Sequence, residues 1–169
     1  GQRKVLIENG VLLDYMWDRK SASKAGHAMT GNGRRQSYHY IAIPRMTNTC
    51  IWNGSSKAPD ILSGTDEGLY AKGLRGGQVD SATGDFVFVV SEAYLIKNGK
   101  LGDAVRGATL TGNGLAVLNE IDAVADNLDF GPGMCGKGGQ NAPAACGQPT
   151  LRIRKITVGG TARRERGNR

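Results

Sequence analysis

Along most of this chain, hydrophobic and polar positions alternate with the two-residue period of β-strands rather than the period of a helix. The clearest segment is residues 86–96, FVFVVSEAYLI. Apolar side chains occupy both alternating faces of its first half, a pattern typical of a strand at the centre of a sheet. A turn at Lys97-Asn98-Gly99 then leads into a returning strand over residues 100–106.

Shorter apolar stretches predict further strands, separated by turns of glycine, proline and asparagine. The first is a hairpin, with strands over residues 4–7 and 11–17 and a turn over residues 8–10. Pro44 cannot donate to a strand ladder, so we expect it to end a strand or to lie at a sheet edge. The other predicted strands are residues 38–43, 48–52, 76–80 and 151–158.

The helical period is weaker and predicts only short helices. Residues 113–124, with leucine, valine and isoleucine at helical spacing, are the strongest candidate. Residues 21–25 can form a helix that Gly26 ends, and residues 59–65 a helix with Pro59 in its first turn. The expected fold class is mainly β (α+β): one domain with a mixed or antiparallel sheet, or a barrel-like one, and one or two short helices.

Glycine accounts for 26 of the 169 residues, about twice its usual share of ~7%. It is densest in GPGMCGKGGQNAPAACGQPT, residues 131–150. Such a run favours steep turns or bare backbone that a ligand can approach closely. Cys135 lies within it and, from the residues alone, could be a metal ligand, a nucleophile or a small buried hydrophobe.

The three cysteines, Cys50, Cys135 and Cys146, form no C-x-x-C pair, which excludes a zinc ribbon and a thioredoxin-like redox motif. Their odd number, without a signal-peptide pattern, predicts reduced thiols and a cytoplasmic protein. No stretch approaches the ~18 uninterrupted apolar residues of a membrane span, so no membrane association is expected.

The formal net charge is +7, and the ending TARRERGNR contributes +3 of it, from four arginines and one glutamate. We expect a domain over residues 1–162, followed by a basic, disordered tail over residues 163–169. In TGNGRRQSYHY, Arg34 and Arg35 stand beside two tyrosines, which can bind single-stranded nucleic acid or a carboxylate, or can form a plain solvated loop. Two arginines are few for nucleic acid, which is therefore not an expected partner.

Residues for catalysis by this chain alone are not recognisable. His27 and His39 lie in no metal-ligand motif, and the chain has no P-loop, G-x-S-x-G elbow or Ser/His/Asp set.

Eight segments between residues 5 and 162 form a specific combination: VLIENGVLLDYMWDRKSA, TGNGRRQSY, PRMTNT, GGQVD, FVFVVSEAYLIKNGK, RGATLTGNG, MCGKGGQ and GQPTLRIRKITVGG. In this order they resemble the TldD/PmbA peptidases. TGNGRRQSY and PRMTNT resemble the TldD branch rather than its PmbA (TldE) partner. The resemblance implies the β-rich C-terminal domain of a zinc metallopeptidase, usually preceded by a larger N-terminal domain.

In that family, a His-Glu-x-x-x-His helix in the preceding domain supplies two zinc ligands and the general base. The cysteine of a Gly-Cys-Gly-Lys motif supplies the third protein ligand. The resemblance therefore implies Cys135 as a metal ligand, zinc as cofactor, and Gly133, Met134 and Gly136 as residues that shape the substrate cleft. It also implies unstructured peptides as substrates and a PmbA/TldE-like partner subunit.

The chain departs from the family pattern in three places. No His-Glu-x-x-x-His occurs in the 169 residues, so we expect no catalytic residue in this chain and no activity from it alone. Residues 141–145 keep only the proline of a Val-Pro-Val stretch, and Cys146 replaces a small residue and is expected to be a packing cysteine. Residues 163–169 are extra. The alternative function is a non-catalytic peptide-binding or assembly module of a TldD-PmbA-type complex.

Overall fold

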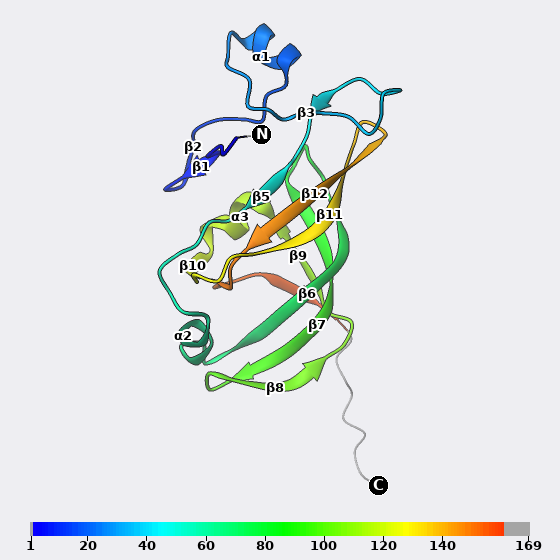
Figure 1. The fold of residues 1–169 in the computed structure, drawn as a ribbon. Coiled ribbons are helices and arrows are strands. Elements are labelled where there is room, and N and C mark those ends of the chain that lie inside the picture. Colours follow the sequence, from blue (N-terminus) through cyan, green and yellow to red (C-terminus); the bar gives the residue numbers. More distant parts are fainter. Residues whose placement is uncertain (1, 161–169) are drawn as a thin grey trace. The chain divides into compact units, whose positions relative to one another are not determined.

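Strands dominate the computed structural model, which describes residues 2–160 (Figure 1). Three short helices accompany them: α1 (Arg19–Ala25), α2 (Ala58–Ser63) and α3 (Gly114–Asn119). In chain order the strands are β1 (Ile7–Glu8), β2 (Val11–Leu12), β3 (Gly33–Arg34), β4 (Ile43–Pro44), β5 (Asn48–Cys50), β6 (Glu67–Val79), β7 (Asp85–Lys97), β8 (Lys100–Val105), β9 (Thr109–Asn113), β10 (Ile121–Val124), β11 (Asp129–Lys137), β12 (Gln140–Gln148), β13 (Leu151–Ile153) and β14 (Thr157–Gly159). The mainly β fold class is confirmed: the sheets are open and antiparallel, except that the sheet of β11, β12 and β5 is mixed because β5 and β12 pair in parallel.

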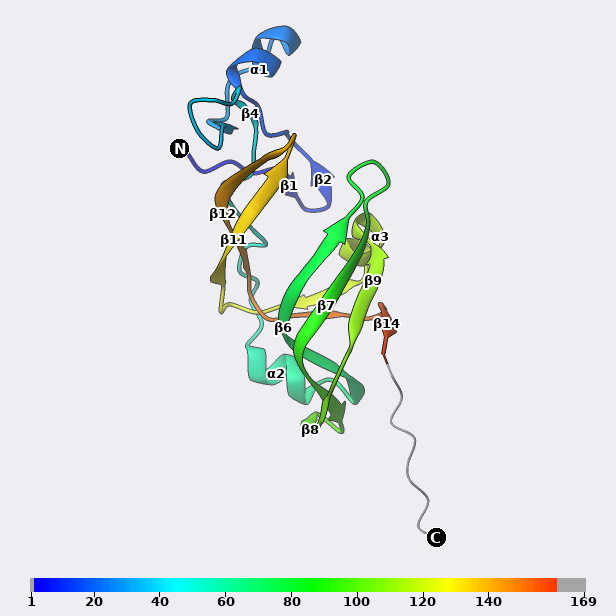
Figure 2. The same cartoon turned by 90° about the vertical axis from the view of Figure 1, so that its right-hand side faces the viewer.

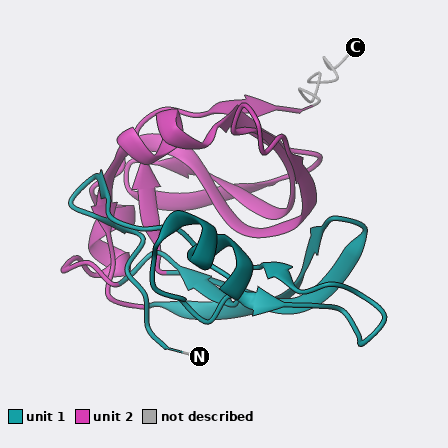
Figure 3. Ribbon diagram, turned by 90° about the horizontal axis from the view of Figure 1, so that it is seen from above, with its two compact units in different colours: residues 1–52, 128–148 teal, residues 53–127, 149–169 magenta. Residues whose placement is uncertain are grey.

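The chain forms two compact units, each made of two separate stretches of sequence (Figure 3). Within the described residues, unit 1 comprises residues 2–52 and 128–148, and unit 2 comprises residues 53–127 and 149–160. The tail predicted over residues 163–169, and the domain end predicted at residue 162, lie outside the described residues. No helix in the described part of the chain is long and apolar enough to cross a membrane.

Unit 2 is built on a five-stranded sheet in which β7 is central, as its two apolar faces predicted (Figure 2). β7 pairs antiparallel with β6, β8 and β9. Its Val90 and Ala93 pack with Ala108 to form the buried core. The opposite face stays open, because Val87 and Val89 are 46% and 42% exposed.

The pairing of β6 with β7 depends on a glycine at position 77. A Cβ atom built there would overlap the Phe88 ring and the Val87 carbonyl oxygen on the neighbouring strand. By contrast, a Cβ at Gly102 on β8 would lie 3.5 Å from its nearest neighbour, the Leu95 carbonyl oxygen.

We therefore expect Gly77→Ala to destabilise the chain by about 1–3 kcal/mol, since one added methyl forces the strands apart. Gly102→Ala is the matched control and should leave stability unchanged or slightly raised, because alanine reduces the entropy of the unfolded chain. Urea unfolding followed by circular dichroism measures both. Equal midpoints for the two variants would contradict the close approach of β6 to β7.

Local sequence signals predicted the presence of two helices: α1 begins two residues before the predicted residue 21 and ends at the predicted residue 25, and α2 covers residues 58–63 rather than 59–65. Asp18 caps α1 through a reciprocal capping box with Ser21, and Gly26 ends the helix in the left-handed conformation at φ 63°. Pro59 lies in the first turn of α2. The third helix of the structure exceeds the expected one or two.

The helix predicted over residues 113–124 is wrong in its second half. α3 ends at Asn119, and β10 follows it and pairs antiparallel with β13. Ile121 lies opposite Ile153, and Asp122 forms an ion pair with Arg152 at 2.8 Å. β-branched side chains fit such a pairing well, so tertiary contacts override the helical period.

Two predicted strands are also corrected. Residues 151–158 divide into β13 and β14, which belong to different sheets. Residues 38–42 form a turn and loop rather than a strand, with the Tyr40 amide donating to the Ser37 carbonyl at 3.1 Å. Pro44 lies in the two-residue strand β4, which pairs antiparallel with β3. The strand predicted over residues 76–80 is the end of the much longer β6.

The predicted N-terminal hairpin is present, with two-residue strands β1 and β2 in place of the longer ones expected. Asn9 and Gly10 turn the chain with φ of 51° and 78°. Beyond it, the Asp14 carboxylate accepts from Lys4 Nζ at 2.6 Å, Trp17 Nε1 at 2.8 Å and the Tyr15 amide at 2.7 Å. The hydrogen bonds from Lys4 and Trp17 lower the pKa of Asp14 from 3.8 to about 2.

Because the pKa of Asp14 is lower in the folded state, its ionised form stabilises the fold above about pH 4, and this stabilisation is lost as the pH falls towards about 2. Asp14→Asn should therefore lower the urea midpoint at neutral pH and flatten its pH dependence between about pH 4 and about pH 2. Tryptophan fluorescence, from Trp17 and Trp52, can follow unfolding. Asp103→Asn, at an exposed β8 position without an ion pair in the described residues, is the control. Identical pH profiles for wild type and Asp14→Asn would contradict the prediction.

Candidate metal-ligand site on the glycine-rich hairpin

The glycine-rich run forms a long antiparallel hairpin of β11 and β12 in unit 1 (Figures 1 and 2). Gly138 and Gly139 make its turn, with φ of 59° and 69° that glycine adopts without strain. β12 pairs on its other side with β5, in parallel. The steep turning expected of this run is thus confined to one point, and the remaining glycines lie in or beside regular strands.

β11 is the outer strand of this three-stranded sheet, and no other described strand pairs with it. The orientation of its backbone follows from two hydrogen bonds of β12. The Pro143 carbonyl accepts from Arg34 Nη2 at 2.5 Å, and the Asn141 amide donates to Gln36 Oε1 at 2.7 Å. Both groups therefore point away from β11.

In an antiparallel ladder, two directly opposite residues either both point their amide and carbonyl groups towards each other or both point them away. Met134 and Gly136 lie opposite Pro143 and Asn141, so their amides and carbonyls point away from β12. Pro132 fits the same pattern, since its missing amide costs no ladder hydrogen bond at this position. Gly133 belongs to the alternate set, whose backbone faces β12. The free edge of β11 thus exposes the amides and carbonyls of Met134 and Gly136, one on each side of Cys135.

Cys135 is half-buried on β11 and is not in a disulfide. Burial by itself would raise the pKa of its thiol. The neighbouring Arg45 side chain, the Met46 backbone and the positive charge of Lys137 outweigh that effect and hold this pKa below its usual value. Relative to an ordinary cysteine, the site therefore shifts Cys135 towards the thiolate, the form that binds metal.

Arg45 lies beside Cys135 and is 1% exposed. Its Nη2 donates to the carbonyl of Cys135 on β11 and, at 3.2 Å, to the carbonyl of Gln140 on β12. The sequence analysis did not single out Arg45. Its place in the PRMTNT segment was the one available signal. Arginine is seldom fully buried, and no local sequence pattern marks a buried arginine.

Gln140, 5% exposed, holds a loop against the tip of the hairpin. Its side chain accepts from the Gln36 amide at 3.1 Å and donates to the Ile41 carbonyl at 3.0 Å. Arg34, considered above as a contact for phosphate or carboxylate, instead bonds the carbonyls of Met46 and Pro143, each at 2.5 Å. These residues serve the scaffold around Cys135.

The other candidate donors do not gather around Cys135. Cys146 lies on β12 and is exposed, so the prediction that it is a packing cysteine is wrong. His27 stacks on Trp17, and His39 lies tilted against Tyr38; both histidines are exposed. Residues 2–160 contain no group of three histidine, cysteine or acidic side chains placed to hold a metal ion. Cys135 can therefore supply one ligand and needs others from outside these residues.

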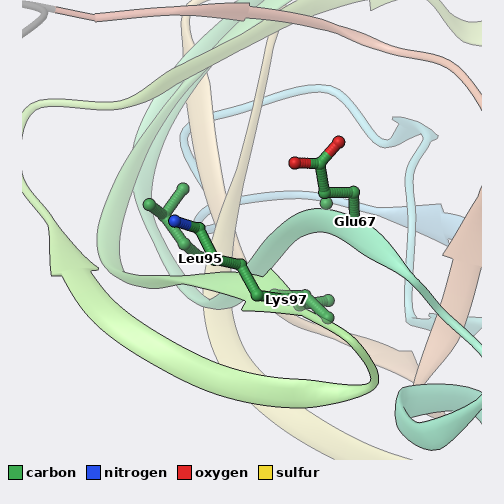
Figure 4. A pocket seen from close by; sticks show the side chains of 5 residues that line it. Glu67, Leu95 and Lys97 are labelled. Carbon is green, nitrogen blue, oxygen red and sulfur yellow. The ribbon is translucent and has the colours of Figure 1, made fainter.

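Unit 2 has a separate surface hollow at one end of β6 and β7 (Figure 4). Its lining includes the side chains of Glu67, Leu95 and Lys97. Glu67 and Lys97 are direct partners across the two strands. The hollow contains neither cysteine nor histidine, so its residues do not provide a zinc site.

Residues 1–160 match the family described as PmbA/TldA metallopeptidase C-terminal domain. The chain is 50% identical over 163 residues to the metalloprotease TldD homolog of Buchnera aphidicola from Acyrthosiphon pisum, covering 95% of this chain and 34% of that protein. It is 50% identical over 162 residues to the TldD homolog of Haemophilus influenzae, with the same coverage. A relative from Saccharolobus solfataricus, 32% identical over 95% of this chain and 36% of its own length, is named a zinc metalloprotease TldD homolog.

The fold is also similar to solved structures. TldE from Thermococcus kodakarensis superimposes with a TM-score of 0.79 at 24% identity, over 94% of this chain and 34% of that one. A putative modulator of DNA gyrase from Thermotoga maritima gives 0.71 at 23% identity, over 92% and 32%. The chain thus spans about a third of the length of its curated relatives. It belongs to the PmbA/TldA metallopeptidase C-terminal domain family, and its relatives from Buchnera aphidicola and Haemophilus influenzae are named metalloprotease TldD homologs.

Proposed function

We propose that this chain is the part of a TldD-type zinc peptidase that supplies Cys135 as one zinc ligand. The observation that carries the proposal is the environment of Cys135, a half-buried thiol whose pKa is lowered by Arg45, the Met46 backbone and Lys137. A thiolate is a good zinc ligand, and one Cys with two His leaves a fourth position open for catalysis.

The rest of the site comes from outside the described residues, where the family pattern has two histidines and a glutamate base. Zinc bound in such a site lowers the pKa of a bound water and polarises the scissile carbonyl. The contribution of this chain is to hold the Cys135 sulfur on a strand fixed by Arg45 and β12. We expect this chain alone to hydrolyse no peptide, since it provides no general base of that pattern.

The free edge of β11 is the proposed binding place for the substrate. An extended peptide can add to a sheet edge through its main chain, which suits unstructured substrates of varied sequence. Met134 and Gly136 offer their outward amides and carbonyls there, and Pro132 limits how far the added strand can extend. Gly133 contributes by its lack of a side chain beside Cys135, rather than by outward hydrogen bonds.

A TldE-like subunit is the proposed partner, and the cytoplasm the proposed location. The fold similarity to TldE supports a pair of related subunits. The non-catalytic alternative, a peptide-binding or assembly module, is favoured by the same free edge of β11. Metal binding distinguishes the two functions.

The test uses a full-length chimaera in which residues 2–160 replace the matched third of the Haemophilus influenzae relative. Purified protein is analysed for zinc by mass spectrometry. We expect about one zinc per chain in the parent and in Cys146→Ala, the exposed-cysteine control, and little in Cys135→Ala. Equal zinc in the parent and Cys135→Ala would refute Cys135 as a ligand, and absence of zinc from the parent would favour the non-catalytic module.

A further inference from the structure

Arg45 carries a buried positive charge that no carboxylate of residues 2–160 compensates. Its side chain is 1% exposed, and it takes part in no ion pair in residues 2–160. Its Nε and Nη1 are buried and have no hydrogen-bond partner in the described part of the chain. A buried charge with unused donors is costly unless an anion or strong acceptor meets it.

Hydrogen bonds hold both the backbone of Arg45 and the tip of its side chain in place. The Arg45 amide donates to the Asn32 carbonyl at 2.8 Å, and Asn32 Nδ2 donates to the Arg45 carbonyl at 3.0 Å. At the other end, Nη2 bridges the carbonyls of Cys135 and Gln140, one on each strand of the hairpin. A side chain so buried cannot reach an exposed peptide, so the acceptor for its free donors must lie inside the site.

We propose that Arg45 is the positioning residue for the Cys135 ligand: it fixes the backbone of Cys135 and donates N–H groups to its sulfur when that sulfur is bound to a metal. This inference rests on the proposed function. The metal-bound sulfur is the anionic acceptor that the unpartnered Nε and Nη1 lack. Hydrogen bonds of this outer kind orient a ligand and strengthen its hold on the metal, and their loss typically costs 10–100-fold in metal affinity.

The chain contains a matched control for the structural part of this role. Arg34 also bonds two main-chain carbonyls, those of Met46 and Pro143, and so also connects a neighbouring segment to β12. It does not bond Cys135. A purely structural role for Arg45 would make its loss resemble the loss of Arg34.

The test replaces zinc by Co²⁺ in the full-length chimaera, because cobalt bound to a thiolate gives a sulfur-to-metal charge-transfer band in the near ultraviolet. We expect Arg45→Met to shift this band and to weaken Co²⁺ and Zn²⁺ binding about 10–100-fold in competition with a chelator. Arg34→Met should keep the band and change affinity less than about twofold. Circular dichroism verifies folding.

Arg45→Lys keeps the buried charge but not the planar fork of donors. It should fold and bind metal with an affinity between those of the parent and Arg45→Met, and it keeps the test decisive where Arg45→Met does not fold. The proposal is overturned if folded Arg45 variants retain the parent band and affinity, or if Arg34→Met changes both as much. Cys135→Ala tests the proposed ligand separately. If Cys135 binds the metal, this variant loses the band; if the variant keeps the band, the proposed ligand is wrong, whatever the Arg45 variants show.

Discussion

Replacing Cys135 with alanine is expected to lower peptide hydrolysis by the full-length chimaera, with its TldE-like partner, at least about 1,000-fold. The physical reason is that a catalytic metal supplies several kcal/mol of transition-state stabilisation, and each 1.36 kcal/mol is about a tenfold change in rate. Loss of one of three protein ligands empties or distorts such a site. Hydrolysis of an unstructured peptide, followed by mass spectrometry, measures the effect.

Cys146→Ala is the control for this prediction, because it removes an exposed thiol from β12 of the same hairpin. Its activity should stay within about twofold of the parent. Retention of most activity by Cys135→Ala would show that hydrolysis does not depend on this sulfur. Measured hydrolysis by residues 1–169 alone would likewise contradict the expectation that the base lies elsewhere.

The second large effect is expected at the edge of β11. Met134→Pro removes an outward amide while leaving the β11–β12 ladder intact, because position 134 faces Pro143 in a pair whose backbone groups point outward. A bound peptide would then leave a carbonyl unpaired, at a cost of about 1–3 kcal/mol. We therefore expect kcat/KM to fall about 10–100-fold with the zinc content unchanged.

Met134→Leu separates the backbone from the side chain. Met134 is 64% exposed, and leucine keeps the amide while changing the side chain. The leucine variant should have nearly the parent kcat/KM if the edge binds peptide main chain. Equal losses in both variants would instead assign the effect to the methionine side chain and contradict strand addition at this edge.

Local patterns were sufficient where neighbouring residues decide the structure. The Asn98-Gly99 turn and the capping of α1 follow from residues within one turn of chain. The central place of β7 agrees with the prediction from its two apolar faces, although one of these faces stays open at Val87 and Val89. Where distant partners decide, the same patterns failed: residues 121–124 follow a helical period but pair with β13.

The sequence by itself determined the mainly β fold and the family to which this chain belongs, and it singled out Cys135, the cysteine that we propose as a zinc ligand. Only the tertiary structure decided that β11 is a free edge, that Met134 and Gly136 point outward from it, and that Arg45 is buried behind Cys135. The reason is the separation along the chain: Arg45 meets the hairpin across 90 and 95 positions. Periodicity reports the local conformation of a segment, whereas burial and strand pairing depend on which remote segments meet it.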